Sequence, residues 1–151
     1  MLTYIFIGFV VVVALAPLLH FVPSKRQKQI ADMRESAALK GLYVAFRQLP
    51  GERLDKTYRT GELIYYGKRL SPRVAGKVDA HHWIREEDGS WRAANWRVSL
   101  PQSLQSLPSG VVAASLDGGS CGVYWVESND PEDVEQICAA VLSWSASLGG
   151  D

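Results

Sequence analysis

The sequence predicts an α+β fold in which an N-terminal transmembrane helix and a basic stalk helix precede a small, mainly antiparallel sheet domain with a C-terminal amphipathic helix. Three observations support this fold class: an uncharged apolar run at the start, short alternating segments between Gly/Pro turns, and an amphipathic pattern at the end. Strands followed by a terminal amphipathic helix are typical of a helix laid on one sheet face. The expected organisation is an anchor over residues 1–23, a basic helix over 24–41 and one domain over 42–151.

The apolar run Leu2–Val22 contains no charged residue. A helix rises about 1.5 Å per residue, so this run matches the roughly 30 Å hydrocarbon core of a bilayer. A cleaved signal peptide is the first alternative, but no basic residue precedes the run and cleavage after Ala16 would leave Pro17 first. A buried soluble helix is the second, and it would normally carry a polar face. We therefore expect a membrane-spanning helix.

The distribution of basic residues predicts the orientation of this helix. None precedes the run, whereas Lys and Arg follow it closely, which by the positive-inside rule places the N-terminus outside and the domain in the cytoplasm. The expected location is a bacterial inner membrane, crossed once, with the lipid bilayer as one partner. The candidates for contact with a membrane surface or another partner are Lys25, Arg26, Lys28 and Arg34.

The formal net charge of zero hides a division along the chain. All sixteen Lys and Arg lie in residues 25–97, where nine acidic residues reduce the excess to plus seven, and residues 98–151 hold seven acidic residues and no basic one. Such a division points to a charged partner or a membrane surface. The alternative is that the two halves pack against each other in one domain, which leaves the surface balanced.

The middle of the chain predicts several short strands. Leu42–Arg47 and Glu62–Tyr66 are two of them, with a surface loop over Glu52–Thr60 between. Asp88-Gly89 predicts a hairpin between residues 78–86 and 91–98. A two-residue turn there would set Trp83 opposite Ala94 and Arg85 opposite Arg92. A short helix or loop follows over 101–107, and then a second hairpin of Val111–Leu116 and Val123–Glu127 around Asp117-Gly118-Gly119-Ser120.

Capping residues mark two of the helices. Ser24 and Gln27 have capping-box spacing before the basic helix, and Gly41 is suited to end it. Asp130 is an expected N-cap with Pro131 at the first helical position. The last helix then carries one apolar stripe at spacings of three and four, made of Val134, Ile137, Cys138, Val141, Leu142 and Leu148.

One serine and one cysteine are candidates for a catalytic nucleophile. Gly118-Gly119-Ser120-Cys121-Gly122 fits the G-x-S-x-G pattern, but a nucleophile elbow needs a helix directly after the serine and a histidine later in the chain. A strand is expected here instead, and glycines in a hairpin turn explain the pattern. Cys121 as a thiol nucleophile lacks an electropositive setting, and with Cys138 it is expected to be a reduced core residue.

The histidines offer an incomplete metal site. Asp79 and His81 would share a strand face, but His82 points to the opposite one, and a metal needs three or four ligands. His81, His82 and Cys121 are kept as secondary polar candidates. The five tryptophans are expected to fill the core, and the basic residues form no stripe, so we expect no nucleic-acid partner. No catalytic set, cofactor or metal is predicted, and a small-molecule ligand is not expected.

The first thirty residues resemble YajC, a small accessory membrane protein associated with the bacterial Sec translocase. The similarity lies in an uncharged N-terminal span that runs into Pro23-Ser24-Lys25-Arg26-Gln27-Lys28-Gln29. The glycine-rich strand motif of that family has no counterpart here. The resemblance implies the layout of the N-terminal part and a role as a translocase accessory.

The function expected from the sequence is that of a non-enzymatic, single-span inner-membrane protein whose cytoplasmic domain binds other proteins, as an accessory subunit of a larger membrane complex. The missing catalytic set, the apolar run and the charge division support this hypothesis. The alternatives are a small membrane-tethered enzyme or ligand-binding domain, and the translocase accessory that the YajC resemblance implies.

Overall fold

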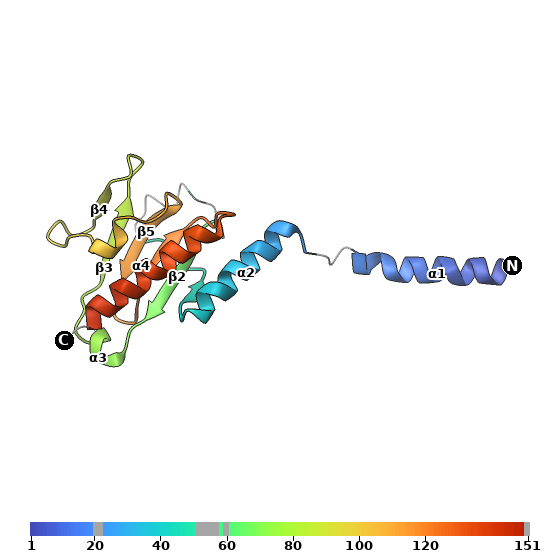
Figure 1. The fold of residues 1–151 in the computed structure, drawn as a ribbon, viewed down its shortest axis with the longest axis horizontal. Coiled ribbons are helices and arrows are strands. Elements are labelled where there is room, and N and C mark those ends of the chain that lie inside the picture. The colour runs from blue at the N-terminus through green and yellow to red at the C-terminus, as the bar shows by residue number, and fades with distance from the viewer. Residues whose placement is uncertain (20–22, 51–57, 59–60, 150–151) are drawn as a thin grey trace.

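The protein is described by a computed structural model that covers residues 1–19, 23–50, 58 and 61–149. One face of a sheet carries two helices, and a further helix projects away from this body (Figure 1). In chain order the elements are α1 (Leu2–Leu19), α2 (Lys25–Leu39), β1 (Tyr43–Ala45), β2 (Ile64–Arg69), α3 (Pro72–Ala75), β3 (His81–Arg85), β4 (Trp91–Ala93), a 3₁₀ turn η1 (Gln102–Leu104), β5 (Val111–Leu116), β6 (Ser120–Trp125) and α4 (Pro131–Gly149).

The sheet has six strands in the order β1-β2-β6-β5-β3-β4, and every neighbouring pair is antiparallel. The α+β fold class with a mainly antiparallel sheet is therefore confirmed. The strand order places β6 and β5 at the centre and β2 beside β6, with Ile64 opposite Trp125 and Arg69 opposite Ser120. Both edge strands, β1 and β4, are three residues long.

Helix α4 lies on one face of the sheet and supplies much of the core. Its N-terminus is capped as predicted, because the Asp130 carboxylate accepts a hydrogen bond from the Glu132 N–H at 2.9 Å. Val134, Ile137 and Val141 of the predicted stripe are fully covered. Trp144 joins them and packs edge-to-face on Trp83 of β3, with ring centroids 5.7 Å apart. Burial of this stripe holds the helix on the sheet.

Helix α2 packs beside α4 as part of the domain. The predicted capping box is present: Ser24 Oγ accepts from the Gln27 N–H at 3.2 Å, and Gln27 Oε1 accepts from the Ser24 N–H at 2.9 Å. Met33 and Ala37 are buried in the main core. The helix ends at Gly41, whose φ of 85° is the left-handed conformation that glycine adopts without strain. Residues 24–41 are thus continuous with the domain rather than a separate stalk.

Helix α1 is apolar, and its described side chains are exposed. Within the described residues, no helix combines the length and the apolar character that a membrane crossing requires. The described α1 has 18 residues and ends at Leu19. Residues 20–22, which the predicted span needed, lie outside the described residues.

This finding overturns the predicted transmembrane anchor over residues 1–23. The single-pass location in a bacterial inner membrane, with the N-terminus outside and the domain in the cytoplasm, depended on that anchor and is corrected with it.

The register of the β3–β4 hairpin differs by one residue from the prediction. Trp83 lies opposite Ala93, and Arg85 lies opposite Trp91 rather than Arg92. The reason is the turn: Glu86 and Ser90 are joined by a 2.8 Å backbone hydrogen bond around a three-residue loop whose Gly89 has a φ of 84°. Three-residue loops of this kind place glycine in the left-handed region. Arg85 then stacks on Trp91, 5.6 Å from the ring centre, which removes the expected repulsion.

The second face of the sheet, opposite α2 and α4, carries a smaller apolar cluster around Tyr65 and Tyr124. Gly67 and Gly122 lie opposite each other in β2 and β6. A Cβ atom on Gly122 would be 2.6 Å from Tyr65 Cζ, so the two glycines leave the space that the Tyr65 ring occupies. Tyr58 and Leu49 pack on this cluster. Apart from Tyr58, the loop predicted over Glu52–Thr60 lies outside the described residues.

Candidate functional site

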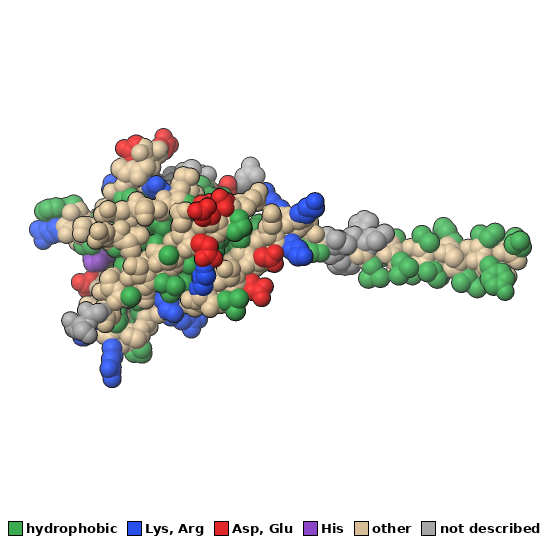
Figure 2. Space-filling view, viewed as in Figure 1, with side chains coloured by type: hydrophobic (Ala, Val, Ile, Leu, Met, Phe, Trp, Pro, Cys, Tyr) green, Lys and Arg blue, Asp and Glu red, His purple; other side chains and the backbone are tan. Residues whose placement is uncertain are grey.

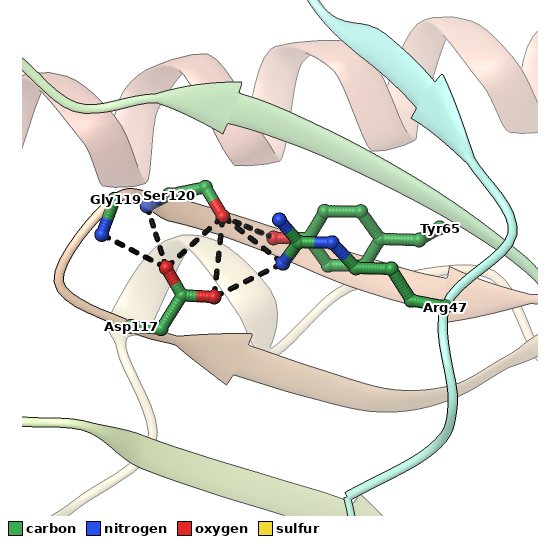
Figure 3. A network of polar contacts seen from close by, with 5 residues as sticks. All are labelled: Arg47, Tyr65, Asp117, Gly119 and Ser120. Carbon is green, nitrogen blue, oxygen red and sulfur yellow. Dashed lines mark hydrogen bonds and ion pairs between the residues drawn. The ribbon is translucent and has the colours of Figure 1, made fainter.

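Ser120, the serine of the G-x-S-x-G pattern, is the first residue of β6, so a strand follows it rather than a helix. Its hydroxyl lies 3.2 Å from the Tyr65 hydroxyl and accepts a hydrogen bond from Arg47 at 3.2 Å (Figure 3). It also lies 3.3 Å from both carboxylate oxygens of Asp117. The structure gives this serine the place expected from a hairpin turn, not that of a nucleophile elbow.

Arg47, Tyr65, Asp117 and Ser120 together form what we call the hairpin network (Figure 3). Arg47 donates to Asp117 at 3.0 Å and lies over the Tyr65 ring at 4.4 Å. Asp117 also accepts hydrogen bonds from the backbone N–H groups of Gly119 and Ser120. Burial opposes ionisation of Asp117, but these backbone bonds and Arg47 outweigh it and lower the pKa of the carboxyl.

The hairpin network joins β1, β2 and the β5–β6 turn through groups that already satisfy one another. Its charged groups are a guanidinium and a carboxylate paired with it, so neither is poised to move a proton. The network therefore holds the turn in place. Asp117 and Ser120 were recognised in the sequence as turn residues, but Arg47 was not, because its partner is 70 residues away.

Both cysteines are free, buried side chains on the helix-covered face. Burial raises the pKa of the Cys121 thiol to about 11, and burial also raises the pKa of Cys138. A thiol with a raised pKa is protonated at neutral pH and reacts slowly. Cys121 thus occupies a core position.

The two histidines point to opposite faces of β3. His81 packs against Trp83 with ring centroids 6.2 Å apart, whereas His82 lies opposite Ser115 of β5 on the second face. Asp79 precedes the strand. Among the described residues, no group of three or more His, Cys, Asp or Glu side chains is arranged to hold a metal ion.

Of the four basic candidates, Lys25, Arg26 and Lys28 are exposed on the first turn of α2, and Arg34 is not. Arg34 makes a two-pronged ion pair with Glu127, with Nε–Oε1 at 2.8 Å and Nη2–Oε2 at 2.6 Å. Arg34 therefore faces the domain. This ion pair joins the basic segment of the chain to the acidic one within a single domain. It agrees with the alternative prediction that the two halves pack against each other.

Glu127 is the centre of what we call the α2 latch, made of Arg34, Tyr66 and Glu127. The Glu127 side chain is 7% exposed, and the Tyr66 hydroxyl donates to Oε1 at 2.9 Å. The hydrogen bond to the Glu127 carboxylate stabilises the charged guanidinium and raises the pKa of Arg34 above its usual value. The latch fixes α2 to the strand pair β2–β6 and so sets the distance between α2 and α4.

A groove of about 170 Å³ runs between α2 and the start of α4. Met33 and Val134 line its floor, and both are almost completely buried. Eight residues form the groove: Gln29, Asp32, Met33, Ser36, Asn129, Pro131, Val134 and Glu135. The floor is apolar and the exposed rim is polar and acidic, which is the usual composition of a small recognition surface.

Acidic side chains dominate the surroundings of this groove. Figure 2 shows them gathered over the N-terminal half of α4 and the adjacent part of α2, with apolar side chains between them. Glu132 and Asp133 occupy the first turn of α4, where they also complement the positive helix end. Glu135 forms an ion pair with Lys40. The sequence indicated the apolar stripe of α4, but it did not indicate that α2 and α4 lie side by side and leave a groove.

A wider hollow of about 510 Å³ lies between the β3–β4 hairpin and the second sheet face. Three of its four charged groups are engaged with each other or with the backbone, and Glu87 is the exception among the described contacts. Arg92 pairs with Glu86 at 2.8 Å, and Arg85 donates to the Pro108 carbonyl at 2.7 Å.

Comparisons with protein families, with characterised proteins and with solved structures found no match to this chain. The resemblance to YajC stays a prediction. The candidate site therefore rests on geometry, and the groove between α2 and α4 is the strongest candidate.

Proposed function

We propose that the domain is a protein-interaction module that binds its partner in the groove between α2 and α4. One observation carries the proposal: a groove between two helices is open at the surface and reaches down to the core side chains Met33 and Val134. Concave apolar patches with a polar rim mark interaction sites on soluble domains.

The rigidity of the groove supports a binding role. The α2 latch holds one wall through Arg34 and Glu127, and the buried stripe of α4 holds the other. A groove that is formed before binding loses little conformational entropy when the partner arrives. The satisfied hairpin network and the raised pKa of Cys121 favour binding over catalysis.

Site-specific photo-crosslinking tests this function. A photoreactive amino acid is placed at Gln29 or at Asn129, which line the groove from two elements, and at Ala31 as an exposed control on α2 outside it. We expect the two groove positions to give the same protein adduct in cells and Ala31 to give none. Equal adducts from all three positions, or none from the groove, would overturn the proposal.

A blocking variant completes the test. Ser36→Arg adds a long side chain at the groove wall, and Ala31→Arg adds the same side chain to an exposed position of the same helix. The first is expected to remove the Asn129 adduct and the second to leave it. Unfolding curves of both variants show that the loss comes from the groove and not from a loss of stability.

A further inference from the structure

We infer that the groove recognises a basic protein segment: one aliphatic side chain enters the groove, and lysine or arginine residues beside it meet the acidic rim. The inference rests on the proposed function and names the class of partner. It is carried by the size of the groove and by the charges around it.

The size of the groove favours a single side chain. Pockets for drug-sized molecules have volumes of about 300–1,000 Å³, and this groove has about 170 Å³. That space suits one medium aliphatic side chain, packed against Met33, Val134 and Pro131. A protein segment can supply such an anchor and place its other side chains on the rim.

The charges of the rim all have one sign. Asp32 and Glu135 line the groove, and no lysine or arginine does. Glu135 is already paired with Lys40, whereas Asp32 takes part in none of the ion pairs seen among the described residues. The same holds for Glu132 and Asp133 on the first turn of α4. Complementary charge on a partner would gain attraction here, and like charge would be repelled.

Lys40 is the one basic residue that forms an ion pair with this surface among the described residues, through Glu135. Residues 98–151, which include all of α4, contain no lysine or arginine. The basic residues near the start of α2 do not line the groove, although Lys28 directly precedes Gln29. A partner segment is thus the natural source of the missing positive charge.

The test uses the full chain and three short synthetic peptides labelled with a fluorophore: leucine flanked by lysines, leucine flanked by glutamates, and glycine flanked by lysines. Binding is followed by fluorescence anisotropy, and amide chemical shifts show where the peptide sits. We expect the lysine–leucine peptide to bind at least about tenfold more tightly than the other two, with affinity falling as salt increases. The shifts should centre on Met33 and Val134.

A pair of charge reversals serves as the control. Asp32→Lys changes the rim, and Glu35→Lys changes an exposed position three residues further along α2 that does not line the groove. The first should weaken the lysine–leucine peptide roughly tenfold, and the second less than about twofold, because exposed charges out of contact are screened.

Three outcomes would overturn the inference. Equal or tighter binding of the glutamate peptide removes the charge preference, and equal binding of the glycine peptide removes the aliphatic anchor. Shifts at the groove that grow with protein concentration, and that no peptide displaces, identify a second copy of the chain as the occupant. In each case the adducts from Gln29 and Asn129 still decide the proposed function, so the two failures are distinguishable.

Discussion

At the scale of single residues, the facing glycines of β2 and β6 control how the second sheet face packs. The ring of Tyr65 lies across Gly67 and Gly122, and its hydroxyl reaches Ser120. Only the absence of a side chain at both glycines leaves room for the ring. A methyl group at either position must displace the ring or separate β2 from β6.

We predict that Gly122→Ala lowers the free energy of unfolding by about 2–4 kcal/mol. The new Cβ would clash with Tyr66 O and lie 2.6 Å from Tyr65 Cζ. Gly118→Ala is the matched control in the adjoining turn, where the nearest atom is 3.8 Å away. Chemical denaturation measures both, and equal effects in the two variants would contradict the steric explanation.

Buried acidic groups give the stability a pH dependence in the alkaline range. Burial raises the pKa of Cys121 to about 11 and raises that of Tyr65 above its usual range. The folded protein thus holds these protons more tightly than the unfolded chain, whose thiol and phenol titrate near pH 8.5 and about 10. The stabilisation is complete below those unfolded-state values and is lost as the pH rises from them through the higher pKa values of the folded protein.

We expect the free energy of unfolding to decline from about pH 9 upward. Cys121 alone should contribute roughly 2 kcal/mol of this decline by about pH 11, since one pKa unit corresponds to about 1.4 kcal/mol. Urea unfolding at a series of pH values measures it. Cys121→Ala should flatten the first part of the decline and Tyr65→Phe the later part. An unchanged slope in both variants would contradict the assignment.

The residue scale also shows what the sequence can predict. The caps at Ser24 with Gln27 and at Asp130 were correctly expected, because a cap acts within a few positions along the chain. Arg34 was expected at a surface and instead binds Glu127, which is 93 residues away. Nothing near Arg34 in the sequence indicates that partner, so the α2 latch could only be seen in the structure.

At the scale of elements, α2 is the part whose position depends most on a single ion pair. Its own stripe buries only Met33 and Ala37. The latch adds two hydrogen bonds from Arg34 to a carboxylate that is almost inaccessible to water. Truncating Arg34 leaves that carboxylate with the Tyr66 hydroxyl and no cation, and such loss of one partner is costly.

We predict that Arg34→Ala destabilises the domain by about 1–3 kcal/mol, less than a fully buried pair because the arginine is partly exposed. Amide hydrogen exchange should show faster opening of α2 than of α4. Arg26→Ala, on the exposed first turn of the same helix, is the control and should change stability by less than about 0.5 kcal/mol. Equal protection of α2 in both variants would contradict the latch.

The hairpin between β3 and β4 shows why the presence of a hairpin was easier to predict than its register or the length of its strands. The Asp88-Gly89 signal correctly indicated a hairpin. It did not distinguish a two-residue turn from the three-residue loop that is present, and one extra residue shifts every cross-strand pair. Arg85 therefore meets Trp91 and not Arg92.

At the scale of the whole molecule, the sequence predicted the fold class but not the strand order. The pairing of β2 with β6 joins residues that are 51 to 61 positions apart, from Arg69 with Ser120 to Ile64 with Trp125. Nothing in a short alternating segment indicates so distant a partner. The groove depends on α2 and α4 lying side by side. The sequence did not indicate it, because these two helices are also far apart along the chain. The predicted membrane anchor was wrong, since no helix among the described residues has the length and apolar character to cross a membrane.

Helix α1 and the domain are expected to be energetically independent. The described side chains of α1 are exposed and Ser24 caps α2 within its own segment. A chain beginning at Pro23 should therefore unfold with a free energy within about 0.5 kcal/mol of the full chain. Urea denaturation of both chains measures the difference. A loss of more than about 1 kcal/mol would show that α1 packs on the domain.

The strand order has a consequence for the time at which the protein can fold during synthesis. Strand β2 is complete at Arg69, but its central neighbour β6 begins only at Ser120. At about 5–20 residues per second, the ribosome leaves β2 paired on one side alone for several seconds. Lys68 and Arg69 then keep charge at the end of an otherwise apolar strand. Because charge at a strand end disfavours pairing with another edge, we expect these two residues to limit mispairing of the nascent chain before β6 emerges.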